Sequence, residues 1–140
     1  MKSAIVTAIG AVGSFVAAAL GGWDTAIITL IVFMGIDYVT GLIVAGGFHA
    51  SKKSDSGGLA SHAGFKGLLK KGMVIVLVIC ANLLDAQIGA SYIRDGVCIA
   101  FIANELLSIV ENASLMGVPI PRAITKALDV LSQQEEEKTS

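Results

Sequence analysis

Residues Thr25–Val44, TAIITLIVFMGIDYVTGLIV, are apolar except for Asp37 and three threonines. A run of this length is close to the ~20 residues that cross ~30 Å of hydrocarbon as a helix. A charged side chain at the centre of such a helix costs about 2.5–3.5 kcal/mol on insertion scales. The segment therefore predicts a membrane-spanning helix in which Asp37 requires a partner, protonation or water.

The composition of the whole chain also indicates a membrane protein. Of its 140 residues, 54% are hydrophobic and 15% are charged, and the mean hydropathy is +0.77. An average globular domain is roughly 25% charged. The length fits one domain. The formal net charge of −1 gives no global basic field, so no nucleic-acid partner is predicted.

Four segments have the composition of spans, and we predict helices over residues 4–22, 25–45, 66–90 and 94–117. The third is long enough only if Lys70 and Lys71 extend to the membrane interface. The fourth contains Glu105 and Glu111. The first also resembles a secretory signal peptide, because Lys2 precedes an apolar run that ends in small residues; we interpret it as a span.

Lys and Arg resist translocation, so their distribution predicts orientation. With four spans and a cytoplasmic N-terminus, the cytoplasmic side carries Lys2, Lys52, Lys53, Lys66, Lys70, Lys71, Arg122, Lys126 and Lys138. The other side carries only Arg94. This asymmetry favours four spans over three, and it assigns Lys66, Lys70 and Lys71 a role in topology at the interface.

The C-terminal segment differs from the spans. Pro119 and Pro121 end the fourth span, because proline has no amide hydrogen and restricts the preceding residue. Apolar residues then recur at helical spacing, which predicts an amphipathic helix over Arg122–Gln134, on the membrane surface or against the bundle. A solvated acidic tail, EEEKTS, follows. The predicted fold is thus all-α, with a transmembrane domain over residues 1–118 and a cytoplasmic segment over residues 119–140.

Polar residues gather on one face of the second and fourth spans. At about 100° per residue, each set falls within an arc of roughly 120°. The members are Asp37 and Thr40 in the second span, and Asn104, Glu105, Ser108, Glu111 and Asn112 in the fourth. They either bond between helices or line an aqueous path in an assembly, and the sequence leaves both interpretations open.

Small residues form two adjacent rows on the first span, Gly10, Ser14, Ala18 and Gly22 in one and Gly13, Ala17 and Gly21 in the other. Such rows let helix backbones approach closely, which drives association in lipid. We predict close helix packing here, within one chain or between copies.

The sequence contains no pattern of a cofactor, metal or catalytic site. Cys80 and Cys98 lie in apolar runs without metal-ligand spacing, and we expect both to be buried as small hydrophobic residues. His49 and His62 lie in a Gly- and Ser-rich loop with nothing nearby to complete a metal site. No phosphate-binding loop or nucleophile with a histidine base is present, so no enzyme is predicted.

Three sequence blocks carry a resemblance to a known family. They are GIDYVTGLIVA, GFKGLLKKGMVIVLVICANLLD and IANELLSIVENASLMGVPIP, in this order over roughly residues 35–121. Together they resemble the toxin-secretion and phage-lysis holins of phages and prophage-derived loci in Gram-positive bacteria, including clostridial toxin-release holins. The family's motif positions here are Asp37, Gly41, Lys66, Gly67, Lys70, Lys71, Asn104, Glu105, Ser108, Glu111, Asn112, Pro119 and Pro121.

The resemblance implies a small protein of the bacterial cytoplasmic membrane that assembles with copies of itself. It then opens lesions wide enough for a cell-wall hydrolase (an endolysin) or a toxin to leave, so the partners are the bilayer, other copies and that cargo. The Gly-Ser loop is longer than the family pattern, and the tail is acidic where holin tails are frequently basic. Two alternatives remain, a small ion channel or transporter subunit, and an anti-holin or membrane scaffold.

Overall fold

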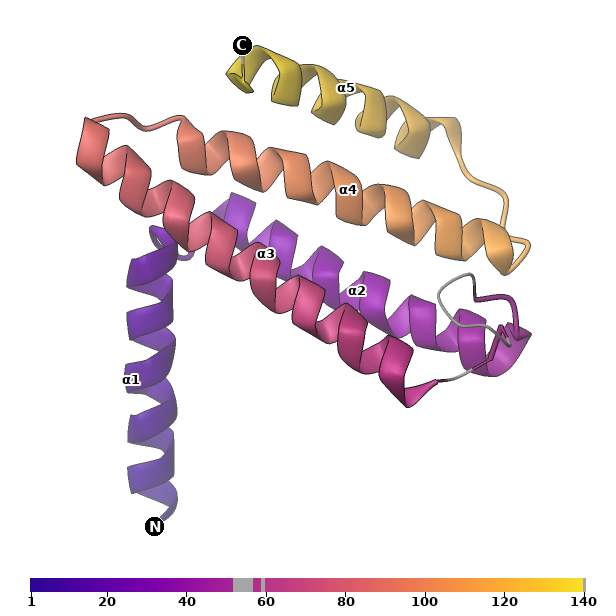
Figure 1. The fold of residues 1–140 in the computed structure, drawn as a ribbon, viewed down its shortest axis with the longest axis horizontal. Coiled ribbons are helices and arrows are strands. Elements are labelled where there is room, and N and C mark those ends of the chain that lie inside the picture. The colour runs from indigo at the N-terminus through magenta and orange to yellow at the C-terminus, as the bar shows by residue number, and fades with distance from the viewer. Residues whose placement is uncertain (52–56, 59, 140) are drawn as a thin grey trace.

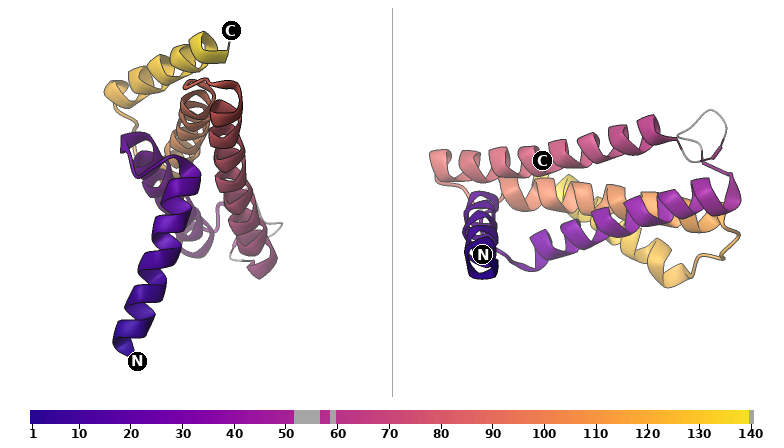
Figure 2. Two further views of the ribbon diagram at one scale, coloured as in Figure 1. Left: turned by 90° about the vertical axis from the view of Figure 1, so that its left-hand side faces the viewer. Right: turned by 90° about the horizontal axis from the view of Figure 1, so that it is seen from below.

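The computed structural model describes residues 1–51, 57–58 and 60–139, which form five α-helices. These helices are α1 (Lys2–Leu20), α2 (Thr25–Phe48), α3 (Ser61–Ile88), α4 (Ile93–Leu115) and α5 (Arg122–Thr139). Helices α2, α3 and α4 lie side by side, α1 projects away from them, and α5 runs antiparallel along α4 (Figure 1). In the left view of Figure 2, the N-terminal end of α1 extends beyond the other helices, whereas the right view looks along the α1 axis.

Local sequence explains where the helices begin and end. Asp24 precedes α2, and its Oδ1 accepts a hydrogen bond from the Ile27 amide at 3.1 Å, as an N-cap does. Helices α1 and α3 each end at a glycine in the left-handed conformation, Gly21 with φ 90° and Gly89 with φ 70°. After α4, two prolines prevent the helix from continuing.

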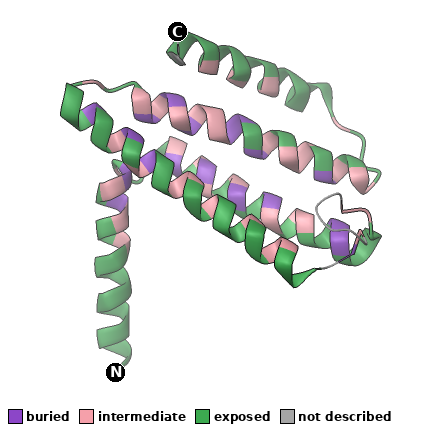
Figure 3. Cartoon of the chain, viewed as in Figure 1, coloured by how far each residue is buried: buried purple, intermediate pink, exposed green. Residues whose placement is uncertain are grey.

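The buried core is small and lies where α2, α3 and α4 meet near the end of α1. It contains Leu20, Ile27, Leu30, Met34, Val78, Cys98 and Ile102. Most of α1 is exposed, as Figure 3 shows, including the large apolar side chains of Ile5, Val6, Ile9, Val12 and Phe15. Exposed apolar surface on this scale is uncommon in soluble monomers and indicates contact with lipid or with other chains.

Three of the described helices, α1, α2 and α3, are long and apolar enough to span a membrane. Helix α4 is long enough but is not among them; it carries Arg94, Asp95, Glu105 and Glu111. The all-helical architecture and three apolar spans therefore agree with the sequence prediction, whereas the fourth span and the orientation stay predictions. Observed bounds differ from the predicted ones by a few residues, most at α3, which begins at Ser61.

Two expectations from the sequence differ from the structure. The C-terminal helix was predicted to end at Gln134, before the solvated acidic tail, but α5 continues through the tail to Thr139, because Glu, Gln and Lys are good helix formers. Cys98 is buried as expected, whereas Cys80 is exposed on α3. When a helix is apolar on all sides, the spacing of its residues does not show which face packs against other helices and which is exposed. The exposure of Cys80 therefore could not be predicted. Lys52 and Lys53, counted in the topology prediction, lie outside the described residues.

Candidate functional site

A buried ion-pair cluster joins the three bundle helices. The Nζ of Lys71, on α3, lies 2.8 Å from Oδ2 of Asp37 on α2 and 2.7 Å from Oε2 of Glu105 on α4. The side chains of Asp37 and Glu105 are only 5% and 6% exposed, and that of Lys71 is 15% exposed. The partner that Asp37 requires is thus Lys71, which the sequence analysis expected at the membrane interface instead.

Amide and hydroxyl groups complete the environment of Asp37. Asn112 on α4 donates from Nδ2 to Oδ1 of Asp37 at 3.0 Å, to the Asp37 carbonyl at 3.2 Å and to Thr40 Oγ1 at 2.8 Å. Thr40 donates in turn to the carbonyl of Ile36 at 2.7 Å. Each carboxylate oxygen of Asp37 therefore has a partner, so α2 and α4 are fixed in one register.

The cluster holds one ammonium and two carboxylates, which gives it a formal charge of −1 when both acids are ionised. Breaking a buried pair by removing one partner is strongly destabilising, because it leaves an uncompensated charge. This arrangement can hold α2, α3 and α4 together while it is dry. Water entering between the helices would solvate the same charges.

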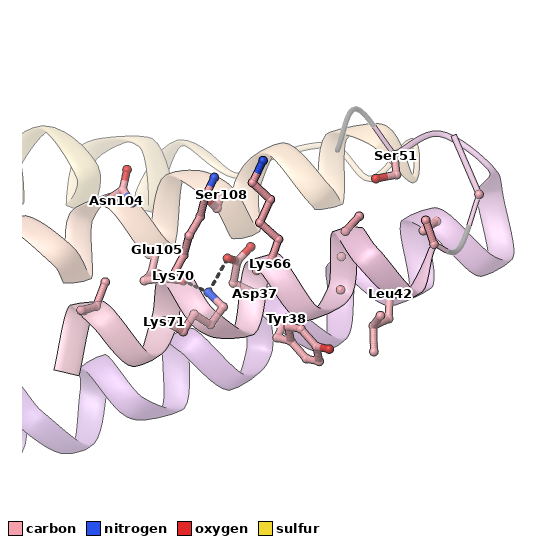
Figure 4. A pocket seen from close by; sticks show the side chains of 18 residues that line it. Asp37, Tyr38, Leu42, Ser51, Lys66, Lys70, Lys71, Asn104, Glu105 and Ser108 are labelled. Atoms are coloured by element: carbon pink, nitrogen blue, oxygen red, sulfur yellow. Dashed lines mark hydrogen bonds and ion pairs between the residues drawn. The ribbon is translucent and has the colours of Figure 1, made fainter. Parts of the chain in front are cut away.

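A pocket of about 440 Å³ lies beside the cluster, between α2, α3 and α4 (Figure 4). Lys71 and the two acids form part of its wall. Lys66, Lys70, Asn104 and Ser108 also line it, together with Tyr38 and Ser51. Lys66 and Lys70 are exposed, and their position at the membrane interface stays a prediction.

The other predicted polar residue, Glu111, is exposed and lies against a much smaller hollow of about 50 Å³ with Ser108 and Asn112. The structure thus brings together Asp37, Thr40, Glu105 and Asn112 by direct contacts, with Lys71 at the centre. The cluster is an interhelical polar face in this single chain.

The small residues of α1 are mostly free of neighbours. A Cβ added at Gly10 or Gly13 would meet no atom within 4 Å, and Ser14 and Ala18 are exposed. Ala17 is buried, and Gly21 and Gly22 form the turn into α2 with φ of 90° and 105°. Most of these rows therefore remain available for contacts outside this chain.

A second charged cluster fastens the α1–α2 turn to the α3–α4 turn. Arg94 is buried; its guanidinium donates to the carbonyl of Leu20 and to both carboxylate oxygens of Asp24, at 2.8 and 3.0 Å. Asp85 accepts hydrogen bonds from the amides of Ile93 and Arg94 at 3.0 and 2.9 Å. It thus caps the first turn of α4.

Hydrogen bonds from Arg94 hold the pKa of Asp24 below its ordinary value, although partial burial acts in the opposite direction. Sequence reasoning counted Arg94 only as the lone positive charge on the far side, and it missed Asp24 and Asp85. One signal was available, since Asp24 directly precedes an apolar helix, where an N-cap belongs. No signal in the sequence indicated the contact between the α1–α2 turn and the α3–α4 turn, because the two turns are separated by about seventy residues.

The second half of α5 packs against α4, whereas residues 122–127 are exposed. Leu131 of α5 packs against the core, and Lys138 near its end lies 3.8 Å from Asp95 Oδ2 at the start of α4. A Cβ added at Gly96 would lie 3.5 Å from the Lys138 Cβ. The end of α5 is therefore beside the beginning of α4.

Apolar helices with exposed apolar surface, joined by buried ion pairs, define a helical membrane protein. The chain belongs to the bacteriophage holin family, whose model matches residues 14–133. Family membership supports a holin role and a non-enzymatic one.

Relatives cover most of the chain. An uncharacterized protein of Clostridium perfringens (strain 13 / Type A) is 38% identical over 116 residues, 81% of this chain and 80% of the relative. An uncharacterized protein of Listeria innocua is 35% identical over 122 residues, 84% of this chain and 81% of the relative. A probable holin of Bacillus phage phi105 is 34% identical over 105 residues, 74% of this chain and 72% of the relative. No solved structure matches.

Proposed function

We propose that this protein is a holin of the bacterial cytoplasmic membrane, which assembles with copies of itself and opens lesions that release a cell-wall hydrolase or a toxin. The observation that carries the proposal is the family match over residues 14–133. The buried polar network gives the proposal a physical basis, because a lesion wide enough for a protein needs polar surface to face water.

The polar faces of α2 and α4 have different surroundings in the two proposed states. In the single chain, Lys71 satisfies Asp37 and Glu105 within the bundle. In an assembly, the same side chains turn toward water, which solvates them in place of the ion pairs. Charged residues inside a span are thus tolerated in both states, although they would be costly against lipid.

If α1 and α4 cross the bilayer beside α2 and α3, then α1 and α5 have to move. Helix α1 projects from the bundle and must turn at Gly21 and Gly22 (Figure 1). Helix α5 lies antiparallel on α4, so Glu135, Glu136 and Glu137 would be carried toward the far side of the membrane. We propose that α5 leaves α4 when α4 inserts, since burying each acid in hydrocarbon costs about 2.5 kcal/mol or more.

The proposal is tested by inducing the protein in a bacterium together with a cytoplasmic wall hydrolase that lacks an export signal. Turbidity and membrane potential are followed over time. Abrupt lysis after a delay, dependent on the hydrolase, supports a protein-sized lesion. Depolarisation without hydrolase release would indicate a small channel instead, and neither effect at confirmed membrane expression would indicate a scaffold or anti-holin.

The polar face has its own test in the same assay. Glu105→Gln removes a charge but keeps side-chain volume, so insertion should be unchanged while the delay or extent of lysis shifts. Asp129→Asn makes the same acid-to-amide change at an exposed position of α5, outside the polar face and the three glutamates, and is the control. Unaltered timing in Glu105→Gln at equal protein level would count against a lining role for this face.

A further inference from the structure

The pocket between α2, α3 and α4 has space and polar groups that the ion-pair cluster does not use. Its volume is about 440 Å³, and Gly41, Gly64 and Gly67 provide part of the room because they lack side chains. Asn104 and Ser108 face it from α4. An amide and a hydroxyl can both donate hydrogen bonds to an anionic oxygen.

Within the part of the chain that the structure describes, Lys66 and Lys70 give this pocket positive charge that is not paired with an acid. Lys71 is paired with two carboxylates, whereas no described carboxylate forms an ion pair with Lys66 or Lys70. They are four residues apart on α3, and Figure 4 shows their side chains extending in the same direction. Like charges at this spacing repel each other. A bound anion would relieve that repulsion.

The charges around the pocket fit a singly charged ligand. Among the described residues that line it, three lysines and two carboxylates carry a net charge of +1 when all are ionised. A phosphodiester carries one negative charge and would neutralise the pocket. A nucleotide or a polyphosphate would leave an excess of negative charge next to Asp37 and Glu105.

The pocket also lies at the depth of lipid headgroups in the proposed orientation. Helix α3 has 28 residues, which extend ~42 Å at ~1.5 Å per residue, whereas the hydrocarbon core is ~30 Å thick. If the excess of ~12 Å lies at the start of α3, Lys66 is outside the core and Lys70 is at its edge, from which its long side chain can extend to the headgroups. Basic pockets between membrane helices on the cytoplasmic side are typical sites for anionic headgroups.

We propose that this pocket binds the phosphodiester headgroup of an anionic phospholipid such as phosphatidylglycerol. Lys66 and Lys70 bind the phosphate, and Ser108 and Asn104 donate hydrogen bonds to its oxygens or to the glycerol hydroxyls. A lipid held here would lie between the helices that have to separate in the proposed lesion. The site requires a membrane location but not lesion formation, so it is testable by binding alone.

The experiment uses the full chain purified in a neutral detergent. Phosphatidylglycerol, phosphatidylcholine and inorganic phosphate are each titrated in, and bound lipid is counted by native mass spectrometry. We expect phosphatidylglycerol to bind more tightly than phosphatidylcholine, and Lys66→Gln/Lys70→Gln to weaken its binding by roughly tenfold or more, since each lysine near a lipid surface contributes a several-fold effect. Lys66→Arg/Lys70→Arg should retain the preference.

Two matched variants distinguish binding in the pocket from a general effect of positive charge on lipid binding. Lys2→Gln/Lys126→Gln removes the same charge from exposed positions elsewhere and should bind phosphatidylglycerol like the original chain. Gly67→Leu keeps every lysine but fills the pocket, and its added Cβ meets no atom within 4 Å; it should lose binding. Equal loss in both lysine pairs, or no loss in Lys66→Gln/Lys70→Gln, would overturn the proposal. Displacement of the lipid by equimolar inorganic phosphate would instead assign the site to soluble phosphate.

Discussion

Lys71 Nζ lies 2.7 Å from Glu105 Oε2, so an ammonium on α3 and a carboxylate on α4 meet inside the bundle. The same ammonium bonds Asp37 on α2 at 2.8 Å. One side chain thus connects three helices. Its removal affects all of them, whereas removal of a lipid-facing apolar side chain affects none of these contacts.

We predict that Lys71→Met destabilises the bundle by about 2–3 kcal/mol, somewhat less than a fully buried pair, because Lys71 retains 15% exposure. The measurement is thermal unfolding in detergent. The triple variant Asp37→Asn/Lys71→Met/Glu105→Gln should recover most of the loss, since no unpaired charge remains. A triple variant as unstable as Lys71→Met would contradict the electrostatic explanation.

The sequence predicted that Asp37 needs a partner, but it could not identify Lys71. A helical wheel shows which residues share a face of one helix, and it was sufficient to group Glu105 with Asn112. The rotation of one helix against another depends on packing in three dimensions. Lys71 also satisfied a competing explanation, because a lysine beside Lys70 near a helix end fits the positive-inside pattern equally well.

The α1–α2 turn contains two adjacent glycines, Gly21 and Gly22, of which the second serves as a control for the first. A Cβ added at Gly21 would lie 2.7 Å from both Arg94 Nε and Asn82 Oδ1, in a backbone conformation with φ 90°. At Gly22, with φ 105°, it would meet nothing within 4 Å. Gly22→Ala therefore carries backbone strain alone, of order 1 kcal/mol. Gly21→Ala carries the same strain and also displaces Arg94.

We expect Gly21→Ala to lower stability by about 1–3 kcal/mol more than Gly22→Ala, because it leaves buried hydrogen-bonding groups unsatisfied. Thermal unfolding in detergent measures the difference, and limited proteolysis of α1 reports its attachment to the bundle. Equal stability of the two variants would show that the contact between the turns contributes nothing.

The small residues of α1 predict association between copies. Gly10→Leu/Ser14→Leu places bulk where this chain has no neighbour at Gly10 and where Ser14 is exposed, so the folding of the single chain should be unaffected. Assembly should weaken by roughly tenfold, or ~1.4 kcal/mol, because helix backbones could no longer approach closely. Chemical crosslinking in membranes measures this. Ala8→Leu/Val12→Leu, at exposed positions about 120–160° around α1 from Gly10 and Ser14, is the control. Crosslinking reduced equally in both variants would contradict the prediction.

The contact between α4 and α5 predicts that an engineered disulfide would hold these two helices together. A Cβ at position 96 would lie 3.5 Å from the Lys138 Cβ, within the 3.5–4.5 Å range of disulfides. In a background with Cys80→Ser and Cys98→Ala, the pair Gly96→Cys/Lys138→Cys should therefore oxidise to a crosslink that holds α5 on α4. If α5 has to leave α4 before α4 crosses the bilayer, the oxidised protein should release no dye from lipid vesicles, and a reductant should restore release.

The control pair Gly96→Cys/Lys126→Cys moves the second cysteine twelve residues along α5, ~18 Å at ~1.5 Å per residue, so it cannot form the crosslink and should release dye with or without reductant. Dye release by the oxidised Gly96→Cys/Lys138→Cys protein at the reduced rate would mean that α4 and α5 remain paired in the active form. In that case the acidic end of α5 stays beside Asp95, and α4 cannot be the fourth span. The disulfide between positions 96 and 138 therefore distinguishes a lesion built from four helices per chain from one built from the three apolar helices alone.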